Sequence, residues 1–288
     1  MSDLTAGVSP WFFVAPGFPG SAIVRRFDMR KYTLTAQLAA TRAFDGGLFY
    51  ILSGYLLKLA QVMILLLLWR SLAAQGADLG GFTLQQLLLY TMLSSVLREQ
   101  LSIVTPATSA FWEGSIISRY LRPLPVLSQL VAETVGSWLP GLALYSAPVL
   151  VGSALCGLDV VANLIANGPL FFLSLLFSIS LGFAIDFLFA AALLYMKNAS
   201  YQAFSIRQAI IKVFSGAVIP FALFPWGIGN MLQLLPFGSI ASAPLLIFGG
   251  AAEATQLLAL QLLWNALLWP LAVVAFRKSQ ERMVSYGG

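Results

Sequence analysis

Very few side chains in this sequence could carry chemistry, and two of them lie inside apolar segments. Lys58 and Asp186 each stand about ten residues from the inner end of a predicted membrane span, which places them about 15 Å deep at helical rise. Two interpretations stay open, with or without a direct pair between the two residues: they line a polar path for a substrate, or they lock two helices together. Lys58 could also extend its amine toward the membrane surface.

The residues that most enzyme chemistry needs are missing from the sequence. It has no histidine, and its single cysteine, Cys156, has no CxxC partner, so Ser-His, Cys-His and thiolate metal sites are unsupported. Lys278 is the only lysine followed by serine or threonine, and no glycine precedes it at the spacing of a P-loop. Paired carboxylates for hydrolysis inside a membrane are also missing. We therefore expect no catalysis, no metal and no cofactor in this chain.

The most informative stretch between two apolar segments runs from Phe111 to Gly136. Within it Trp112, Ile116 and Tyr120 recur at i, i+4 and i+8, and this spacing predicts a short helix with one apolar and aromatic face. A short amphipathic helix between two spans is suited to inserting aromatic side chains into a groove of another protein. The alternative is a surface helix that lies on lipid.

The same stretch contains charged residues and a proline-rich turn. Glu113, Arg119 and Arg122 lie off the apolar face of the predicted helix. Pro123 and Pro125 are expected to stop the helix and to act as a hinge that turns the chain back toward the membrane.

The composition is that of an integral membrane protein. Of the 288 residues, 59% are hydrophobic and 9% are charged, whereas soluble domains have about 25% charged residues. Runs of about 20 apolar residues can cross a hydrocarbon core of about 30 Å as helices. The net charge of +5 comes from basic residues in short loops beside these runs. We therefore expect contacts with membrane lipids and no binding of nucleic acid.

The apolar runs predict a single all-α membrane domain with six transmembrane helices. A leader (1–28) without the character of a signal peptide precedes an interfacial helix (29–45), the bundle (46–276) and a cytoplasmic tail (277–288). The alternative for 29–45 is an ordinary charged flank of the first span. Thr83 is the expected N-cap of the second span. The predicted spans cover residues 48–69, 84 to between 98 and 105, 130–151, 170–196, a fifth from 208, and 255–276.

The distribution of charge predicts the orientation and an interrupted fifth span. With the N-terminus inside, fourteen of the 16 lysines and arginines lie on the cytoplasmic side or at its boundary, while Arg70 is outside and Lys58 is within the first span. Residues 213–252 carry no charge but contain four prolines, so we expect short re-entrant helices on the outer side. No internal repeat is evident, which argues against a secondary transporter built from inverted repeats.

The order of these features resembles the ABC-2 type permeases, the integral membrane subunits of one class of ABC transporter. The stretch EGSIISRYLRPLPVLSQLVAETVG is similar to the family's glycine-containing cytoplasmic helix, its LRPLP-like turn, and the acidic residue and glycine of its third span. Here these elements are Gly114, Leu121 to Pro125, Glu133 and Gly136. The resemblance also covers MRKYTLTAQLAATRAF and SGAVIPFALFPWGIGNMLQLLPF, but not the leader or Asp186.

The resemblance implies an exporter subunit of the plasma or inner membrane, with both termini cytoplasmic. Its partners would be a separate ABC ATPase that holds ATP and Mg, and a second permease chain, identical or related. Residues 111–121 would be the coupling helix, 29–45 would also lie near the ATPase, and 221–244 would form the outer gate. The coupling residues would be Trp112, Glu113, Gly114, Ile116, Arg119, Tyr120 and Arg122. The gate residues would be Pro220, Phe224, Pro225 and Trp226.

Two other functions stay open. One is a membrane scaffold or assembly subunit that has no translocation path. The other is an ion channel, which is less favoured because no ring of polar residues facing a pore is evident in the sequence. The cargo of a transporter is not identified by the sequence.

Overall fold

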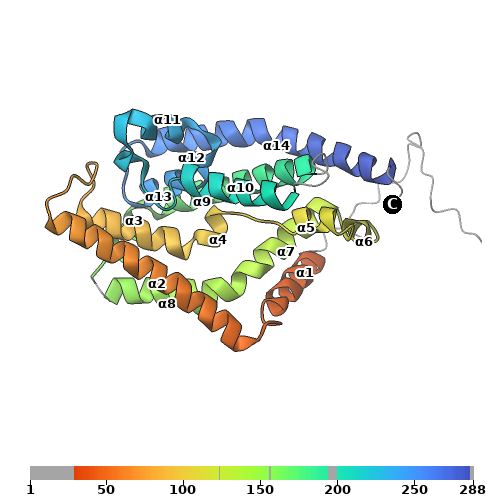
Figure 1. Ribbon diagram of the computed structural model, residues 1–288, viewed down its shortest axis with the longest axis horizontal. Coiled ribbons are helices and arrows are strands. Elements are labelled where there is room, and N and C mark those ends of the chain that lie inside the picture. The colour runs from red at the N-terminus through yellow and green to blue at the C-terminus, as the bar shows by residue number, and fades with distance from the viewer. Residues whose placement is uncertain (1–28, 123, 156, 194–199, 286–288) are drawn as a thin grey trace, which may run out of the picture.

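The computed structural model describes residues 29–122, 124–155, 157–193 and 200–285, and every regular element in these ranges is a helix (Figure 1). In chain order the elements are α1 (Met29–Arg42), α2 (Gly47–Ala74), α3 (Leu84–Val96), α4 (Arg98–Leu101), α5 (Ala107–Trp112), α6 (Ile116–Tyr120), α7 (Val126–Gly141), η1 (Leu142–Ser146), α8 (Ala147–Leu155), α9 (Val160–Leu193), α10 (Ser200–Phe214), η2 (Phe221–Leu223), η3 (Pro225–Gly227), α11 (Ile228–Leu234), α12 (Pro236–Ile240), α13 (Ser242–Phe248) and α14 (Ala254–Ser285).

Four segments in the described ranges are long and apolar enough to cross a membrane. They are α2, the continuous run from α7 through η1 to α8, α9, and α14 up to Ser279. These segments match the predicted first, third, fourth and sixth spans, although α9 begins at Val160, earlier than predicted. The predicted second span is divided into α3 and α4, and the predicted fifth is the 15-residue α10. Six complete crossings therefore stay a prediction.

Helix α3 is central to the bundle although it is shorter than a membrane span. Ten of its 13 residues are buried, and it packs against α2, α8 and α13. The predicted cap at its start is confirmed: Thr83 Oγ1 accepts a hydrogen bond from the Gln86 amide, and Gln86 Oε1 accepts one from the Thr83 amide. This reciprocal pair satisfies two backbone donors and fixes the point at which α3 begins.

Helices α9 and α14 form the most extensive helix pair, held by aromatic packing and by hydrogen bonds. Phe187 of α9 and Phe276 of α14 are almost fully buried, with ring centroids 5.7 Å apart. Nearer the start of α14, the buried Gln261 side chain donates to Ser178 Oγ at 2.9 Å and to the Ser239 carbonyl oxygen at 2.8 Å. Because Ser239 belongs to α12, this amide attaches the short helix α12 to both long helices.

The predicted helix at residues 29–45 forms as α1 and packs along α7. Tyr32 and Ala36 are half-buried, whereas Leu34 and Leu38 on the other side are more than 50% exposed. The close approach depends on Gly136 of α7, because a Cβ at this position would overlap the backbone of Ala36. The structure thus gives one glycine of the central stretch a packing role.

The two ends of the bundle are built differently (Figure 1). Helices α1, α5 and α6 and the C-terminal end of α14 lie toward one end, whereas α11 and α13 and the connection from α2 to α3 lie toward the other. The proline-rich segment after α10 is divided into short helices from η2 to α13, as its prolines predicted. Trp226 and Gly227 both have positive φ, 58° and 71°, and turn the chain sharply between η3 and α11.

Candidate functional site

The connection between α4 and α7 contains the segment that the sequence predicted to dock another protein. The structure divides it into α5 and α6, so the prediction of one continuous helix over residues 111–122 is wrong. The interruption follows from Gly114, whose φ of 70° lies in the left-handed region that residues with a side chain rarely adopt. The chain therefore bends between the two short helices.

This bend changes which side chains face outward. Ile116 is fully buried in the core, so its predicted place on a docking face is wrong. The exposed apolar surface consists instead of Ile117 (47% exposed), Tyr120 (45%) and Leu121 (84%). Partial burial raises the pKa of Tyr120 to about 12, so its hydroxyl stays neutral at physiological pH. The side chain of Trp112 lies outside the described residues.

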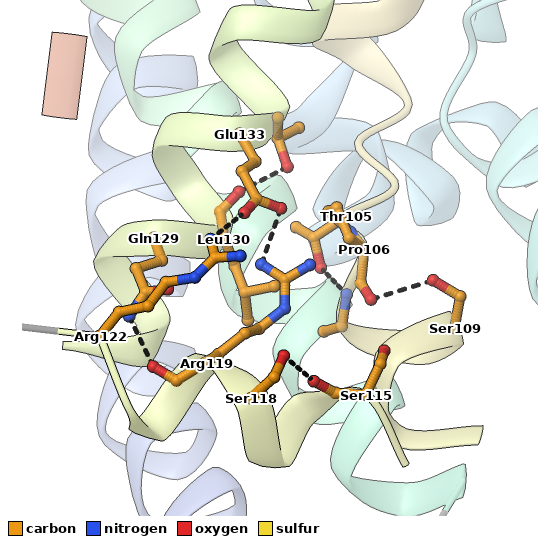
Figure 2. Close-up of polar contacts among 12 residues, drawn as sticks. Thr105, Pro106, Ser109, Ser115, Ser118, Arg119, Arg122, Gln129, Leu130 and Glu133 are labelled. Carbon is orange, nitrogen blue, oxygen red and sulfur yellow. Dashed lines mark hydrogen bonds and ion pairs between the residues drawn. The ribbon is translucent and has the colours of Figure 1, made fainter. Parts of the chain in front are cut away.

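Both arginines of the segment turn back toward the bundle and meet Glu133 on α7 (Figure 2). Arg119 Nη1 lies 2.7 Å from Glu133 Oε2, and Arg122 Nη1 lies 3.5 Å from Glu133 Oε1. The side chains of Glu133 and Arg119 are only 9% and 13% exposed, while that of Arg122 is 45% exposed. The two guanidinium groups compensate for the little access that this carboxylate has to water. We call these three residues the glutamate clamp.

A second attachment lies one turn nearer the start of α7. Gln129 Nε2 donates to the carbonyl oxygens of Arg119 at 2.9 Å and Leu124 at 2.7 Å. Pro125 directly precedes α7, with φ −58° and ψ 134°, and so ends the turn as predicted; Pro123 lies outside the described residues. The α5–α6 segment is therefore held to α7 through both side chains and backbone.

Asp186 and Lys58 do not pair with each other, which corrects one of the predicted arrangements. Asp186 is fully buried, and its Oδ1 lies 2.8 Å from Arg207 Nη2 of α10. Its Oδ2 accepts hydrogen bonds from the backbone amide and the hydroxyl of Thr105, and Arg207 Nη2 also donates to the Ile103 carbonyl oxygen at 2.9 Å. We call Asp186, Arg207 and Thr105 the buried lock, because they join α9, α10 and the connection between α4 and α5.

Lys58 has a different partner and a more open environment. Its Nζ lies 2.7 Å from Glu99 Oε1 on α4, and the two side chains are 27% and 37% exposed. The ammonium group also lies 5.2 Å from the ring centroid of Tyr55 and 5.9 Å from that of Tyr145. Such contacts stabilise a lysine that is partly removed from water. Of the two predicted roles, locking helices together fits Asp186. Lys58 instead lies close to an open surface.

A groove of about 390 Å³ begins beside Glu99. Its walls come from α2, α3, α4, α10 and the residues that follow α10, and its charged lining residues are Arg98, Glu99 and Lys212. Arg98 Nη1 donates to Gln61 Oε1 of α2 at 3.0 Å. This groove, defined by these walls, is a concave surface on which charged and polar side chains stand among apolar ones. The sequence analysis did not foresee it.

The predicted gate residues occupy the end of the bundle opposite α5 and α6. Pro220 is buried, whereas Trp226 is 91% exposed. Pro225 begins η3, and the ring of Phe224 lies 6.0 Å from that of Phe221. No contact among these residues marks a closed gate in the described part of the chain, so the gate stays a prediction.

The residues that the structure describes contain no evident metal-binding site. No group of three or more cysteine, aspartate or glutamate side chains gathers there. The acidic residues that matter, Glu99, Glu133 and Asp186, are each engaged by a basic side chain.

Comparison with known families gives one match. The family described as ABC-2 family transporter protein matches residues 59–287, which is most of the chain. Comparisons with curated proteins and with solved structures found no match. The matched region includes the groove, the buried lock, the glutamate clamp and the predicted gate, but begins after α1.

Proposed function

This chain belongs to the ABC-2 transporter family, and on that premise we propose that it is the permease subunit of an ATP-driven exporter. The chain forms half of a translocation path, and a second permease chain, identical or related, forms the other half. A separate ATPase, which binds ATP and Mg, docks at the end of the bundle that carries α5 and α6. That end faces the cytosol, and the protein lies in the plasma or inner membrane.

The glutamate clamp is the observation that carries this proposal. A docking surface must transmit force to the helices that cross the membrane, and a short helix on a flexible loop would not do so. Here Arg119 and Arg122 bind a buried carboxylate on α7, so a push on α5 or α6 reaches a long helix directly. The exposed apolar side chains of Ile117, Tyr120 and Leu121, together with the exposed Glu113 of the same segment, supply a surface of mixed character for the contact.

The buried lock gives the same motion a second route. Thr105 accepts a hydrogen bond from the Ala107 amide at the start of α5 and donates one to Asp186 of α9. Arg207 extends this connection to α10. Displacement of α5 is therefore transmitted toward α9 and α10. The second half of α10 leads to the predicted gate. A movement of α10 would open or close the groove that it lines.

Co-purification tests the docking proposal. The permease is expressed with a candidate ABC ATPase, and the complex is isolated through a tag on the permease. Glu113→Lys reverses an exposed charge beside the docking surface and should reduce recovery of the ATPase several-fold. Glu253→Lys, an equally exposed charge reversal at the other end of the bundle, is the matched control.

Two results would count against the proposal. If no ATP-hydrolysing subunit is recovered with the wild-type chain, the scaffold interpretation is favoured instead. If Glu113→Lys and Glu253→Lys recover the ATPase equally well, the docking surface is not at α5 and α6.

A further inference from the structure

The groove between α2, α4 and α10 contains two basic side chains that lack acidic partners. Arg98 and Lys212 are both exposed, and within the described residues neither has a carboxylate oxygen within 4 Å. The one carboxylate that lines the groove, Glu99, is already paired with Lys58 at 2.7 Å. The groove therefore presents positive charge that no acidic side chain of the described residues neutralises.

These two charges line a concave surface between helices of the bundle. Charged side chains among the helices of a membrane domain face a water-filled cavity or other protein. We therefore expect this side of α10 to face water or a substrate rather than lipid.

Three other polar side chains of the groove already form hydrogen bonds within the protein. The hydroxyl of Ser94 donates to the Ala217 carbonyl oxygen, and that of Ser95 bonds with Tyr145. Thr91 donates to the Leu87 carbonyl oxygen at 2.9 Å and accepts from Trp69.

The remaining lining of the groove completes its chemical character. Apolar side chains stand beside these two basic residues, on α2, on α10 and after it; they are Val62, Leu65, Ile211 and Val218. The groove thus offers a ligand two cationic donors, together with the polar side chains of Ser102 and Gln208, next to an apolar wall.

We propose that this groove binds an amphiphile with an anionic head group, such as a phosphate or a carboxylate, as the transported substrate. Arg98 and Lys212 bind the head group, and the apolar wall receives the tail. The volume of about 390 Å³ suits a head group with part of its tail. This inference rests on the proposed function, because it assigns the substrate class of the same path.

Binding to the full-length permease tests the substrate class without the ATPase. The chain is placed in nanodiscs of zwitterionic lipid and titrated with dodecyl phosphate, the anionic probe, and with dodecyl maltoside, an uncharged probe with the same tail. Saturable binding of dodecyl phosphate that is at least about tenfold tighter than that of dodecyl maltoside supports the proposal. Equal binding of the two probes would overturn it.

Variants locate the binding in the groove. Arg98→Gln and Lys212→Gln should each weaken dodecyl phosphate binding about tenfold, since each removes a charged hydrogen-bond donor, and leave dodecyl maltoside unchanged. Arg98→Lys should keep most of the affinity, which separates loss of charge from misfolding. Arg277→Gln, an exposed basic residue near the end of α14, is the control. Equal loss in the Arg277 variant would contradict the assignment.

Two competitors distinguish the sources of the anion. Displacement by short-chain phosphatidylglycerol supports a membrane lipid as the ligand, and resistance to it supports another anionic amphiphile. Full displacement by inorganic phosphate at the same concentration would show that the tail contributes nothing and would overturn the proposal. Because binding is measured without ATP, its failure would leave the docking of the ATPase intact, and the reverse also holds.

Discussion

The buried lock and the Lys58–Glu99 pair are two ion pairs of nearly the same length in very different surroundings. Asp186 and Arg207 are 2.8 Å apart with side chains 0% and 5% exposed. Lys58 and Glu99 are 2.7 Å apart with side chains 27% and 37% exposed. The first pair is enclosed by α9, α10 and the connection between α4 and α5, whereas the second lies beside an open groove.

This difference in exposure distinguishes a pair that stabilises the fold from a pair that can act on a substrate. A fully buried pair cannot reach a substrate, and the loss of one partner leaves an uncompensated charge in the core. A half-exposed pair contributes little stability, because water screens it, but its charges can be felt by a molecule in the groove. We therefore expect substitutions in the buried lock to lower stability most and substitutions in the Lys58–Glu99 pair to lower it least. Substitutions in the glutamate clamp should have an intermediate effect.

The largest effect is expected at the buried lock. Asp186→Ala should lower the free energy of unfolding by about 3–5 kcal/mol, because Arg207 stays buried without its counter-ion. Thermal unfolding of the purified protein in detergent measures this change. The double variant Asp186→Leu with Arg207→Met should recover most of the loss, since apolar side chains of similar volume replace both charges. If Asp186→Ala were as stable as the wild-type protein, the two ion pairs would not differ in their contribution to stability.

An intermediate effect is expected at the glutamate clamp. Glu133→Ala removes the partner of one largely buried arginine and of one half-exposed arginine, so it should cost about 1–3 kcal/mol. The same thermal measurement applies, with Glu253→Ala as an exposed carboxylate control that should change stability very little. A loss as large as that of Asp186→Ala would mean that the clamp belongs to the rigid core rather than to a movable connection.

The smallest effect is expected at Lys58. Lys58→Ala should change stability by at most about 1 kcal/mol, because its pair with Glu99 is screened by solvent. Transport by the reconstituted complex should nevertheless fall, since Glu99 then stays unpaired beside the groove and repels an anion. Glu99→Gln in the Lys58→Ala background should restore part of the transport. Unchanged transport in Lys58→Ala would place this pair outside the path.

A double-mutant cycle tests whether the two pairs are independent. The stability losses of Lys58→Ala and Asp186→Ala should add to within about 0.5 kcal/mol, because the two residues have different partners. A cycle on Lys58 and Glu99 should instead show coupling. Coupling between Lys58 and Asp186 would contradict the pairing that the structure shows.

Much of the fold follows from local signals in the sequence. Long apolar runs predicted the four long helices, Thr83 predicted the start of α3, and four prolines predicted the interrupted segment after α10. Each of these features depends on residues close together in the chain. The break in the predicted docking helix also had a local signal, because Gly114 stands in its middle, but the apolar spacing at i, i+4 and i+8 assumed a helix without interruption.

The pairing of charges could not be predicted in the same way. Lys58 and Glu99 are 41 residues apart, and the choice between Glu99 and Asp186 depends on how α2 packs against α3 and α4. Arg207 stands one residue before the predicted start of the fifth span at residue 208, whereas α10 begins at Ser200 and includes it. Which helices are neighbours is decided by packing across the whole bundle.

The central claim is that the glutamate clamp transmits the work of the ATPase to the membrane helices. It is tested most directly by the amount of substrate transported per ATP hydrolysed, measured in the reconstituted complex with Glu133→Gln. This variant keeps the shape of the side chain but removes the charge that binds Arg119 and Arg122. We predict that the complex still assembles and hydrolyses ATP while transport per ATP falls several-fold. A wild-type ratio in an intact complex would contradict the account.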